Sequence, residues 1–590
     1  ANQHGGDVSK MDEIPPPTAD EPRYERVHRV LRRYDEHLTD TERDFLTLFS
    51  AFRTPVHVSA FDKVFGVEVK AEVEAEEKPG LLKRLFGRGL TSPPLGGIEG
   101  GLVQRLLTYR ILRHNPHDDT YTTHPLIRNH YFARLTAGDP STSSGQARQT
   151  AQDAHERIKD YYLELAGDTP RFPTLDDLAP LIEVVHHACR AGAYDEAYQV
   201  LQERIYQEWP RRVLVNQLGA WETALALMQE FFPDGDISSE NEPQVSDLGA
   251  KSWILNEVGL CLMNLGRLGE AVTFYERAVA GYLDMENLDM ENWSAASIIY
   301  RNLAGLHAYL GALAASADAA RQALALARRA ENKQDEVDSM GYQAWAVHLL
   351  GDLKTAERVY LQAEALQREI NPSLRYHYSV DGIKHADHLW RAPVEEGGDP
   401  AYARRVTEAN LEICQRNRVV QQISQCYRVL GDLDAGAGNH ENARAHYDQA
   451  LKIARAITHR PSLIEALLAR GRWAARRAYQ SQTSEVWKTS KVSAFSGLNE
   501  ALGYAVEGGY RVYEADIRVA LAWAHLAAGE PERARQEALR RAQDEAERAQ
   551  QMSVEMGYHW GQVDAAEVLA ALEQCAANAH GHLGVLHNDD

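Results

Sequence analysis

Residues 252–278 read SWILNEVGLCLMNLGRLGEAVTFYERA, and this stretch decides the fold. Its small residues stand at positions 8, 15, 20 and 27 of the block. They are Gly259, Gly266, Ala271 and Ala278, and the spacing returns at Ala304, Gly311, Ser316 and Ala323, at Ala344, Gly351, Ala356 and Ala363, and at Gly431, Gly438, Ala443 and Ala450. Small residues at fixed positions indicate that two helices cross closely inside each unit and that the units stack. The sequence therefore predicts a mainly α protein built on an α-solenoid.

Bulky residues recur in the same frame, because Tyr275, Tyr360 and Tyr447 all stand at position 24. The glycine at position 15 favours a left-handed turn between two helices. This pattern resembles the tetratricopeptide repeat. Blocks that begin near residues 252, 297, 337, 375, 424, 464 and 515 predict about seven helix pairs within 246–556, and 557–590 would form a capping helix and tail. We expect insertions at 391–400 and 479–492.

Composition sets the broad class of the protein. The 590 residues are 44% apolar and 25% charged, which is typical of a soluble chain of several domains. The formal charge of −22 opposes non-specific binding to nucleic acid or to an anionic membrane. Without a membrane-spanning apolar run or a signal-like start, we expect a cytoplasmic protein. The five cysteines form no C-x-x-C pair, and Cys261 and Cys426 should be buried apolar residues.

Residues 24–136 predict a winged helix, preceded by a linker or the end of a missing module at 1–23. Thr39 and Glu42 fit a capping box at the start of one helix. A short helix at 59–65, an insertion at 67–100, a helix at 99–108 and a hairpin at 109–123 complete the order helix, helix, helix, hairpin. Winged helices often read DNA through the third helix, but here it offers only Gln104 and Arg105, so nucleic acid is an unlikely partner.

Two stretches carry a closer resemblance. Residues 38–55 and the sequence YTTHPLIR at 121–128 look like the winged-helix module of STAND proteins, the NB-ARC and NACHT family of signalling NTPases. In that family a histidine of an M-H-D-like motif contacts the β-phosphate of ADP, and His124 stands at that place. Pro125 replaces the family's aspartate. From the residues alone, His124 is equally a helix-entry residue before a proline at the first helical position.

The resemblance implies a preceding ATPase domain, yet this chain contains no G-x-x-x-x-G-K-[ST] loop. We therefore expect no enzyme activity and no cofactor in this chain, whereas ADP or ATP is implied for the full-length protein. The chain would be the C-terminal part of a bacterial STAND protein. A linker at 137–152 and an irregular helical-repeat region at 153–245 would join the winged helix to the array.

Candidate ligand positions follow from the repeat frame. In tetratricopeptide proteins, positions 2, 5, 9 and 12 face the concave surface, where tryptophan and arginine are favoured at binding hot spots. These positions select Trp253, Asn256, Arg301, Trp345, His348, Arg428, Arg472 and Trp523. The arginines suggest a protein or peptide ligand with carboxylates. The tryptophans could instead pack between units.

Asp381, His385 and His388 have metal-like helical spacing, but histidines are common on exposed faces of repeat helices and we expect no metal. Three functions remain open. The chain is the ligand-sensing and autoinhibitory region of a STAND ATPase, a tetratricopeptide scaffold without nucleotide control, or a fragment of a transcription regulator of the maltose-activator type. In the first case the missing nucleotide-binding domain is an intramolecular partner.

Overall fold

The computed structural model describes residues 35–66, 100–137, 144–207, 211–238, 240–283, 290–481, 484–528 and 532–585. The chain forms two compact units, one of residues 1–169 and 176–200, the other of residues 170–175 and 201–590. The division between the units falls inside 153–245, which we had expected to be one region. The predicted linker at 1–23 and residues 67–99 of the predicted insertion lie outside the described residues, as does most of the helix expected at 24–38.

The first unit begins with the predicted order of elements. They are α2 (Asp40–Ser50), β1 (Val56–His57), α3 (Ser59–Lys63), α4 (Gly100–Thr108), β2 (Leu112–Asn115), β3 (Thr120–Thr123) and α5 (Pro125–Ala137). The strands form an antiparallel sheet in the order β1-β3-β2, with Val56 opposite Tyr121 and Leu112 opposite Thr123. Strand β1 was not predicted, because two residues are too few to show an alternating pattern.

The start of α2 confirms the capping box. The backbone N–H of Glu42 donates to Oγ1 of Thr39 at 3.3 Å, and the backbone N–H of Thr39 donates to Oε2 of Glu42 at 2.8 Å. Behind this cap, Phe45 and Phe49 are buried in the core of the unit. Arg105 of α4 forms an ion pair with Glu42 at 3.1 Å, so one of the two polar side chains considered for DNA contact already has a partner.

Helices α6 (Ser144–Leu165), α7 (Leu175–Ala191) and α8 (Tyr194–Val200) follow. The expectation of a linker over 137–152 was wrong for residues 144–152, which are the first turns of α6. Serine and glycine at the start of this stretch suggested a flexible connector, but the segment 146–152 contains alanine, arginine and glutamine, which are good helix formers. The short connector that remains, 138–143, lies outside the described residues.

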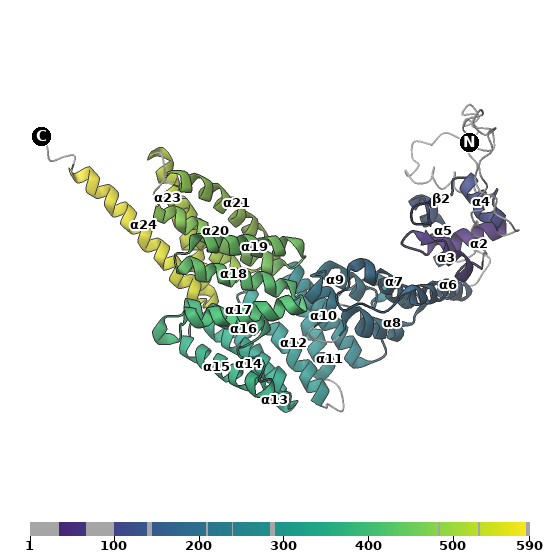
Figure 1. Cartoon of the computed structure of the whole chain (residues 1–590), viewed down its shortest axis with the longest axis horizontal. Helices are drawn as coiled ribbons and strands as arrows, with labels where there is room; N and C mark the ends of the chain where they lie inside the picture. Colours follow the sequence, from purple (N-terminus) through teal and green to yellow (C-terminus); the bar gives the residue numbers. More distant parts are fainter. Residues whose placement is uncertain are drawn as a thin grey trace, which may run out of the picture. The chain divides into compact units, whose positions relative to one another are not determined.

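The second unit opens irregularly and then becomes regular. Its first elements are the π-helical segments η4 (Leu201–Tyr206) and η5 (Val213–Gln217), then α9 (Trp221–Gln229) and the 3₁₀ turn η6 (Pro233–Gly235). Seven antiparallel pairs and a last helix follow in the described residues (Figure 1). They are α10 (Leu248–Leu265) with α11 (Leu268–Leu283), α12 (Met290–Tyr309) with α13 (Leu313–Arg329), α14 (Lys333–Leu350) with α15 (Leu353–Ile370), α16 (Ser379–Arg391) with α17 (Pro400–Asn417), α18 (Val420–Gly436) with α19 (His440–Ala456), α20 (Arg460–Ser481) with α21 (Ser484–Gly508), α22 (Arg511–Leu526) with α23 (Glu532–Met556), and α24 (His559–Val585). The predicted solenoid is confirmed.

The structure explains the small-residue template. The glycines at position 15 turn the chain between paired helices with positive φ, for example 87° at Gly266 and 91° at Gly351. At position 8 the small residue meets the tyrosine of position 24. A Cβ atom on Gly431 would lie 2.6 Å from the ring of Tyr447, so the close crossing of α18 and α19 requires glycine there.

The two irregular places have different structures. Residues 391–400 contain the 3₁₀ turn η7 (Val394–Glu396), and Asp399 then caps α17 by accepting a hydrogen bond from the backbone N–H of Tyr402 at 2.8 Å. In the expected insertion at 479–492, the described residues are helical and lengthen α20 and α21. The second insertion therefore extends a helix pair instead of forming a separate loop.

Late repeats pack against early ones within this unit. The hydroxyl of Tyr510, between α21 and α22, donates to the carbonyl oxygen of Met263 in α10 at 2.7 Å. The backbone N–H of Thr458 donates to the carbonyl oxygen of Gly219 at 3.1 Å. The helix contacts have a constant offset, because α10 contacts α20, α12 contacts α22 and α14 contacts α24. Later pairs therefore stack on earlier ones after one turn of the superhelix, and the inner face of that turn contains the candidate site.

Candidate functional site

The first helices of successive pairs surround a cavity of about 150 Å³. Its walls come from α12, α14, α16, α18, α20, α22 and α24. Four of the eight predicted ligand positions line it, namely Trp345, His348, Arg428 and Arg472. The repeat frame therefore placed half of the predicted set around one cavity.

The other four predicted positions lie elsewhere in the array. Trp253 contacts the ring of Tyr206 edge-on at 5.4 Å, and Asn256 is buried and accepts a hydrogen bond from Asn302 at 2.9 Å. Arg301 forms an ion pair with Asp338 at 3.3 Å. Trp523 is buried and packs against Tyr479, with 5.1 Å between ring centroids. These side chains pack between elements of the array, which is the alternative that large aromatic residues favour.

The cavity arginines have carboxylate partners on neighbouring inner helices. Nη2 of Arg428 in α18 lies 2.8 Å from Oδ2 of Asp387 in α16. Arg472 of α20 contacts Asp432 of α18 at 3.1 Å. Arg391 of α16 likewise forms an ion pair with another helix, because it lies 2.7 Å from Asp564 of α24. The arginines thus link one unit to another, and an acidic ligand would have to compete with these pairs.

Tryptophan rings form the apolar part of the wall. Trp390 donates from Nε1 to Asp387 at 3.1 Å, and the guanidinium carbon of Arg391 lies 4.4 Å from the ring centroid of Trp560. Trp345 packs against this interior from α14. Trp390 and Trp560 were not among the predicted positions, since one lies at the end of an irregular unit and the other enters from the last helix.

Lys384 of α16 is a cavity residue that the sequence reasoning missed. Its Nζ lies 3.1 Å from the ring centroid of Tyr342 and 4.0 Å from that of Trp345, so two aromatic faces hold the ammonium group. Burial lowers the pKa of Lys384 to about 7, against the attraction of Asp381. Burial also raises the pKa of Asp381 to about 7.

Two carboxylates complete the polar part of the wall. Glu465 accepts hydrogen bonds from Tyr513 and from Gln425, the latter at 3.0 Å, and burial raises its pKa. Asp516 accepts from the hydroxyl of Tyr558 at 3.1 Å through Oδ2. Its other oxygen, Oδ1, is buried without a hydrogen-bond partner among the described residues. Burial raises the pKa of Asp516 to about 6.

The histidines considered as metal ligands lie behind the cavity wall. His385 and His388 are completely buried, contrary to the exposed face that we expected, and their Nε2 atoms lie 3.5 and 3.3 Å from Oε2 of Glu357. Asp381 faces α14 instead, where a Cβ on Gly341 would lie 2.5 Å from its carboxylate. Across the described ranges, no group of three or more such side chains is placed to hold a metal ion.

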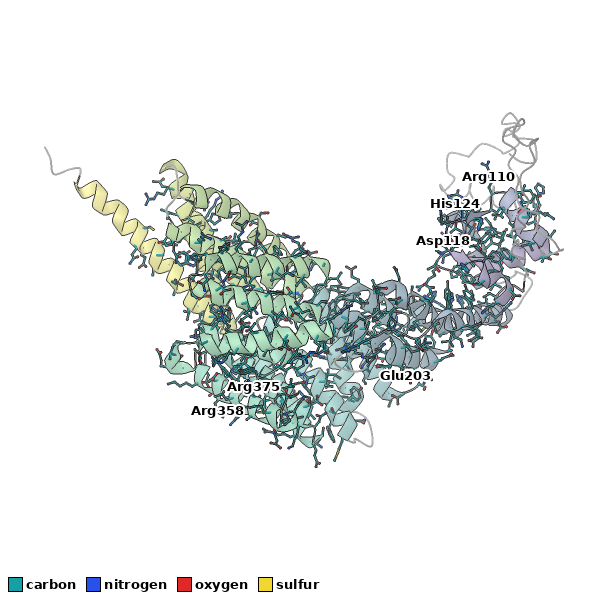
Figure 2. All side chains as sticks on the ribbon, in the orientation of Figure 1. Arg110, Asp118, His124, Glu203, Arg358 and Arg375 are labelled. Carbon is teal, nitrogen blue, oxygen red and sulfur yellow. The ribbon has the colours of Figure 1, made fainter. Side chains whose placement is uncertain are left out.

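His124 lies in the first unit, exposed at the start of α5 (Figure 2). Its Nδ1 accepts a hydrogen bond from the backbone N–H of Leu126 at 3.2 Å, which is the helix-entry role considered from the sequence. Arg128 in the next turn donates from Nε to the carbonyl oxygen of Ser50 at 3.1 Å and ties α5 to α2.

Two general features bear on location and redox chemistry. In the part of the chain that the structure describes, every helix is too short or too polar to span a bilayer. The cysteines are free thiols, and Cys261 and Cys426 are buried as predicted.

Comparison with known proteins supports the repeat assignment. A family model of the tetratricopeptide repeat matches residues 254–280, which lie in the pair of α10 and α11. No curated protein matches the chain. The match and the seven helix pairs together make this a helical-repeat protein of tetratricopeptide type.

Solved structures give weaker similarities. A signal transduction ATPase with numerous domains (STAND) protein with a tetratricopeptide repeat sensor from Pyrococcus horikoshii is 11% identical, with a TM-score of 0.37, over 95% of this chain and 67% of that chain. The Rap conjugation gene regulator of plasmid pLS20, in complex with the Phr* peptide, is 13% identical with a TM-score of 0.38, over 63% and 96%. A Rap protein complexed with competence and sporulation factor is 12% identical with a TM-score of 0.29, over 69% and 99%.

Proposed function

We propose that this chain is the ligand-sensing and autoinhibitory region of a STAND signal-transduction ATPase, and that its repeat array binds a protein or peptide ligand on the inner face. The observation that carries the proposal is the cavity on the inner face, because seven helices contribute to one surface. A ligand that contacts this surface acts on early and late repeats together. Its binding energy can therefore shift the array between closed and open forms.

The ion pairs around the cavity give this shift a physical route. Arg428, Arg472 and Arg391 each join two inner helices, and each faces the interior. A ligand carboxylate that takes one of these arginines removes a link between units at the same moment as it binds. The gain from the new contact offsets the lost one, so the array can rearrange at modest net cost.

His124 supports the link to a nucleotide-binding domain. It lies at the N-terminus of a 13-residue helix, where the backbone N–H groups and the helix dipole favour an anion. In the STAND proteins that the winged-helix stretch resembles, a histidine at this place contacts the β-phosphate of ADP. We infer that His124 has that role when the nucleotide-binding domain is present, and that ADP holds the protein in its inactive form.

The natural gene and its full-length product test this proposal. The sequence upstream of Ala1 should encode a P-loop, and the purified full-length protein should retain ADP. The change His124→Ala should weaken ADP retention about tenfold or more, as loss of a charge-assisted contact does. His117→Ala, an exposed histidine of the neighbouring hairpin, is the matched control. A gene without a P-loop would refute the proposal and favour a scaffold without nucleotide control.

A further inference from the structure

We propose that the cavity on the inner face recognises a peptide through a carboxylate, which accepts a hydrogen bond from the ammonium group of Lys384, and through an apolar side chain beside that carboxylate. This inference deepens the proposed sensing function and rests on it, because it names the chemistry of the peptide that the inner face binds. It also assigns the carboxylate contact to a lysine, whereas the sequence analysis expected arginines in that role.

The wall of the cavity is more basic than the rest of the protein. Its lining contains four lysine or arginine side chains and three aspartate or glutamate side chains, although the whole chain has 63 of the former and 85 of the latter. Three of the four cations, Arg391, Arg428 and Arg472, already contact carboxylates. Lys384 is the fourth. A ligand anion is therefore favoured over a ligand cation at this wall, and Lys384 is the side chain that can meet it.

Lys384 keeps a hydrogen-bond donor for a ligand. Its Nζ lies 3.1 Å from the ring centroid of Tyr342 and 4.0 Å from that of Trp345, and within the described ranges it forms no salt bridge. The side chain is partly exposed, and Nζ is not among the fully buried polar atoms that lack a partner, so part of its surface is accessible. An ammonium group has three N–H donors, and two ring faces take at most two of them.

The carboxylates around Lys384 have other partners or stay out of contact. Asp338 of α14 forms an ion pair with Arg301 of α12 at 3.3 Å. Glu465 of α20 accepts two hydrogen bonds from neighbouring side chains. Asp381, one turn earlier on α16, attracts the ammonium group without forming a salt bridge with it. A ligand carboxylate would supply the direct contact that this part of the described structure does not give to Lys384.

Indole rings make the neighbouring wall apolar. Trp345, on which Lys384 rests, packs against the apolar cluster that contains Trp560. Trp390 and Trp560 also line the cavity, and both of their indole N–H groups donate to side chains of the protein. Their ring carbons therefore favour an apolar group of the ligand. A carboxylate next to an apolar side chain is supplied either by an acidic residue within a peptide or by an apolar residue at its C-terminus.

Titration separates a contact with Lys384 from a contact with an arginine. Burial lowers the pKa of Lys384 to about 7, with repulsion by Arg301 and against the attraction of Asp381, Glu465 and Asp338. A bound carboxylate favours the charged ammonium group, so the affinity should fall as pH rises above 7, by at most about tenfold per pH unit. A guanidinium group stays charged throughout this range, and a contact with it would show no such fall.

Pools of synthetic hexapeptides are the probe. In one set both ends are blocked, by an N-acetyl and a C-amide group, and a fixed pair of an acidic residue and leucine or phenylalanine stands between random residues. A second set has leucine or phenylalanine at a free C-terminus. Matched pools replace the acid by its amide. Fluorescence anisotropy with this chain should show at least about tenfold tighter binding of acid than of amide in one set, and that set identifies the source of the carboxylate.

Variants of the chain assign the contact. In Lys384→Met, acid and amide pools should bind equally. Lys384→Arg should keep the preference for the acid and lose its decline between about pH 7 and 9. In Asp381→Asn the decline should remain, because it belongs to the lysine. Lys452→Met, on the exposed face of α19, is the matched control and should change neither property. If thermal melting shows that Lys384→Met is unstable, Lys384→Arg and the pH profile of the wild type test the same contact.

Two results would overturn the inference. One is that acid and amide pools bind the wild-type chain equally, or that neither binds. The other is a preference for acid that does not decline above pH 7 and that Lys384→Met leaves unchanged, which would assign the carboxylate contact to the arginines. Neither result bears on the P-loop or on ADP retention, so the inference can fail while the proposed function stands. A gene without a P-loop would in turn leave the peptide preference unchanged.

Discussion

The indole Nε1 of Trp560 in α24 donates a hydrogen bond to Nε2 of His348 in α14 at 2.9 Å. Because an indole nitrogen can only donate, Nε2 of His348 is the acceptor and the ring proton is on Nδ1. This Nδ1 lies 3.0 Å from Nδ1 of His388, which must accept, so the proton of His388 is on Nε2 and faces Glu357 at 3.3 Å. The hydrogen bonds therefore all donate in one direction, from Trp560 in α24 to His348 in α14 and from His348 to His388 in α16.

Removing the indole donor of Trp560 should weaken the packing of α24 against α14. Trp560→Phe keeps an aromatic ring but leaves the acceptor on His348 unmatched, and we expect the free energy of unfolding to fall by about 1–3 kcal/mol. Trp293→Phe is the matched control, because its ring stacks with Arg329 on α13 and is remote from the cavity. Urea denaturation measures both. Equal effects of the two changes would show that the hydrogen bond to His348 contributes nothing to stability.

Stability should decrease in acid because of buried neutral histidines. Burial, with the nearby His388, lowers the pKa of His348 well below its usual value, and burial lowers that of His377 to about 3. Since both folded-state pKa values lie below the unfolded value of about 6.5, the unfolded chain binds more protons in acid. The stabilisation is present above about pH 6.5 and is lost as pH falls toward 3, by at most about 2.7 kcal/mol per pH unit for the two groups.

His377→Phe tests one of the two contributions. Neither ring nitrogen of His377 has a hydrogen-bond partner in the described ranges, so phenylalanine removes the titrating group without breaking a bond. The slope of unfolding free energy against pH between 6 and 4 should decrease by up to about 1.4 kcal/mol per pH unit. A slope equal to that of the wild type would contradict a buried, neutral His377.

The template glycine of α18 offers a matched pair of substitutions. Gly431→Ala should destabilise the protein by about 1–3 kcal/mol, because its Cβ would lie 2.6 Å from Tyr447 and overpack the crossing with α19. Gly436→Ala, at the end of the same helix, meets nothing within 4 Å and should be neutral or stabilising by up to about 1 kcal/mol. Thermal unfolding of both variants is sufficient. A tolerated Gly431→Ala would refute the close crossing.

Arg428 should stabilise the fold through its ion pair with Asp387, whether or not a ligand is bound. Its side chain is 11% exposed and contacts Asp387, so Arg428→Ala leaves a half-buried carboxylate without its partner and should cost about 1–3 kcal/mol. Arg444→Ala is the control, because that side chain is 67% exposed in a loose pair and should change stability by less than about 1 kcal/mol. Chemical denaturation compares them. If both variants changed the free energy of unfolding by similar small amounts, Arg428 would not stabilise the fold and would be interpreted as a ligand contact.

The repeat units were predictable because their signal is local. Positions 8 and 24 of a block meet inside one helix pair, as Gly259 and Tyr275 do, and position 15 turns the chain between the two helices. The inner positions of the irregular unit that begins near residue 375 were harder to predict from its sequence. In the block that begins near Arg375, Lys384 and Asp387 stand at positions 10 and 13, one residue beyond the inner positions 9 and 12, although both line the cavity.

The remaining cavity residues had no local signal. Trp560 and Asp516 reach the interior because late helices pack against early ones, and a repeat frame does not predict where an array meets itself. The frame also selected Arg428 correctly as an inner residue but could not show that Asp387 of the preceding unit neutralises it. Pairing between units depends on their relative rotation, which many small packing contacts determine together.

The contacts between Tyr510 and Met263, and between Thr458 and Gly219, constrain how this array can evolve. An open solenoid can gain or lose a unit at low cost, because each unit contacts only its neighbours. Here a helix pair inserted between α10 and α20 would move every later unit away from its early partner, whereas a pair added after α24 would continue the same stacking. The geometry therefore fixes the number of repeats in one superhelical turn, and we expect natural variation in length to occur within helices, as in α20 and α21, or at the ends of the array.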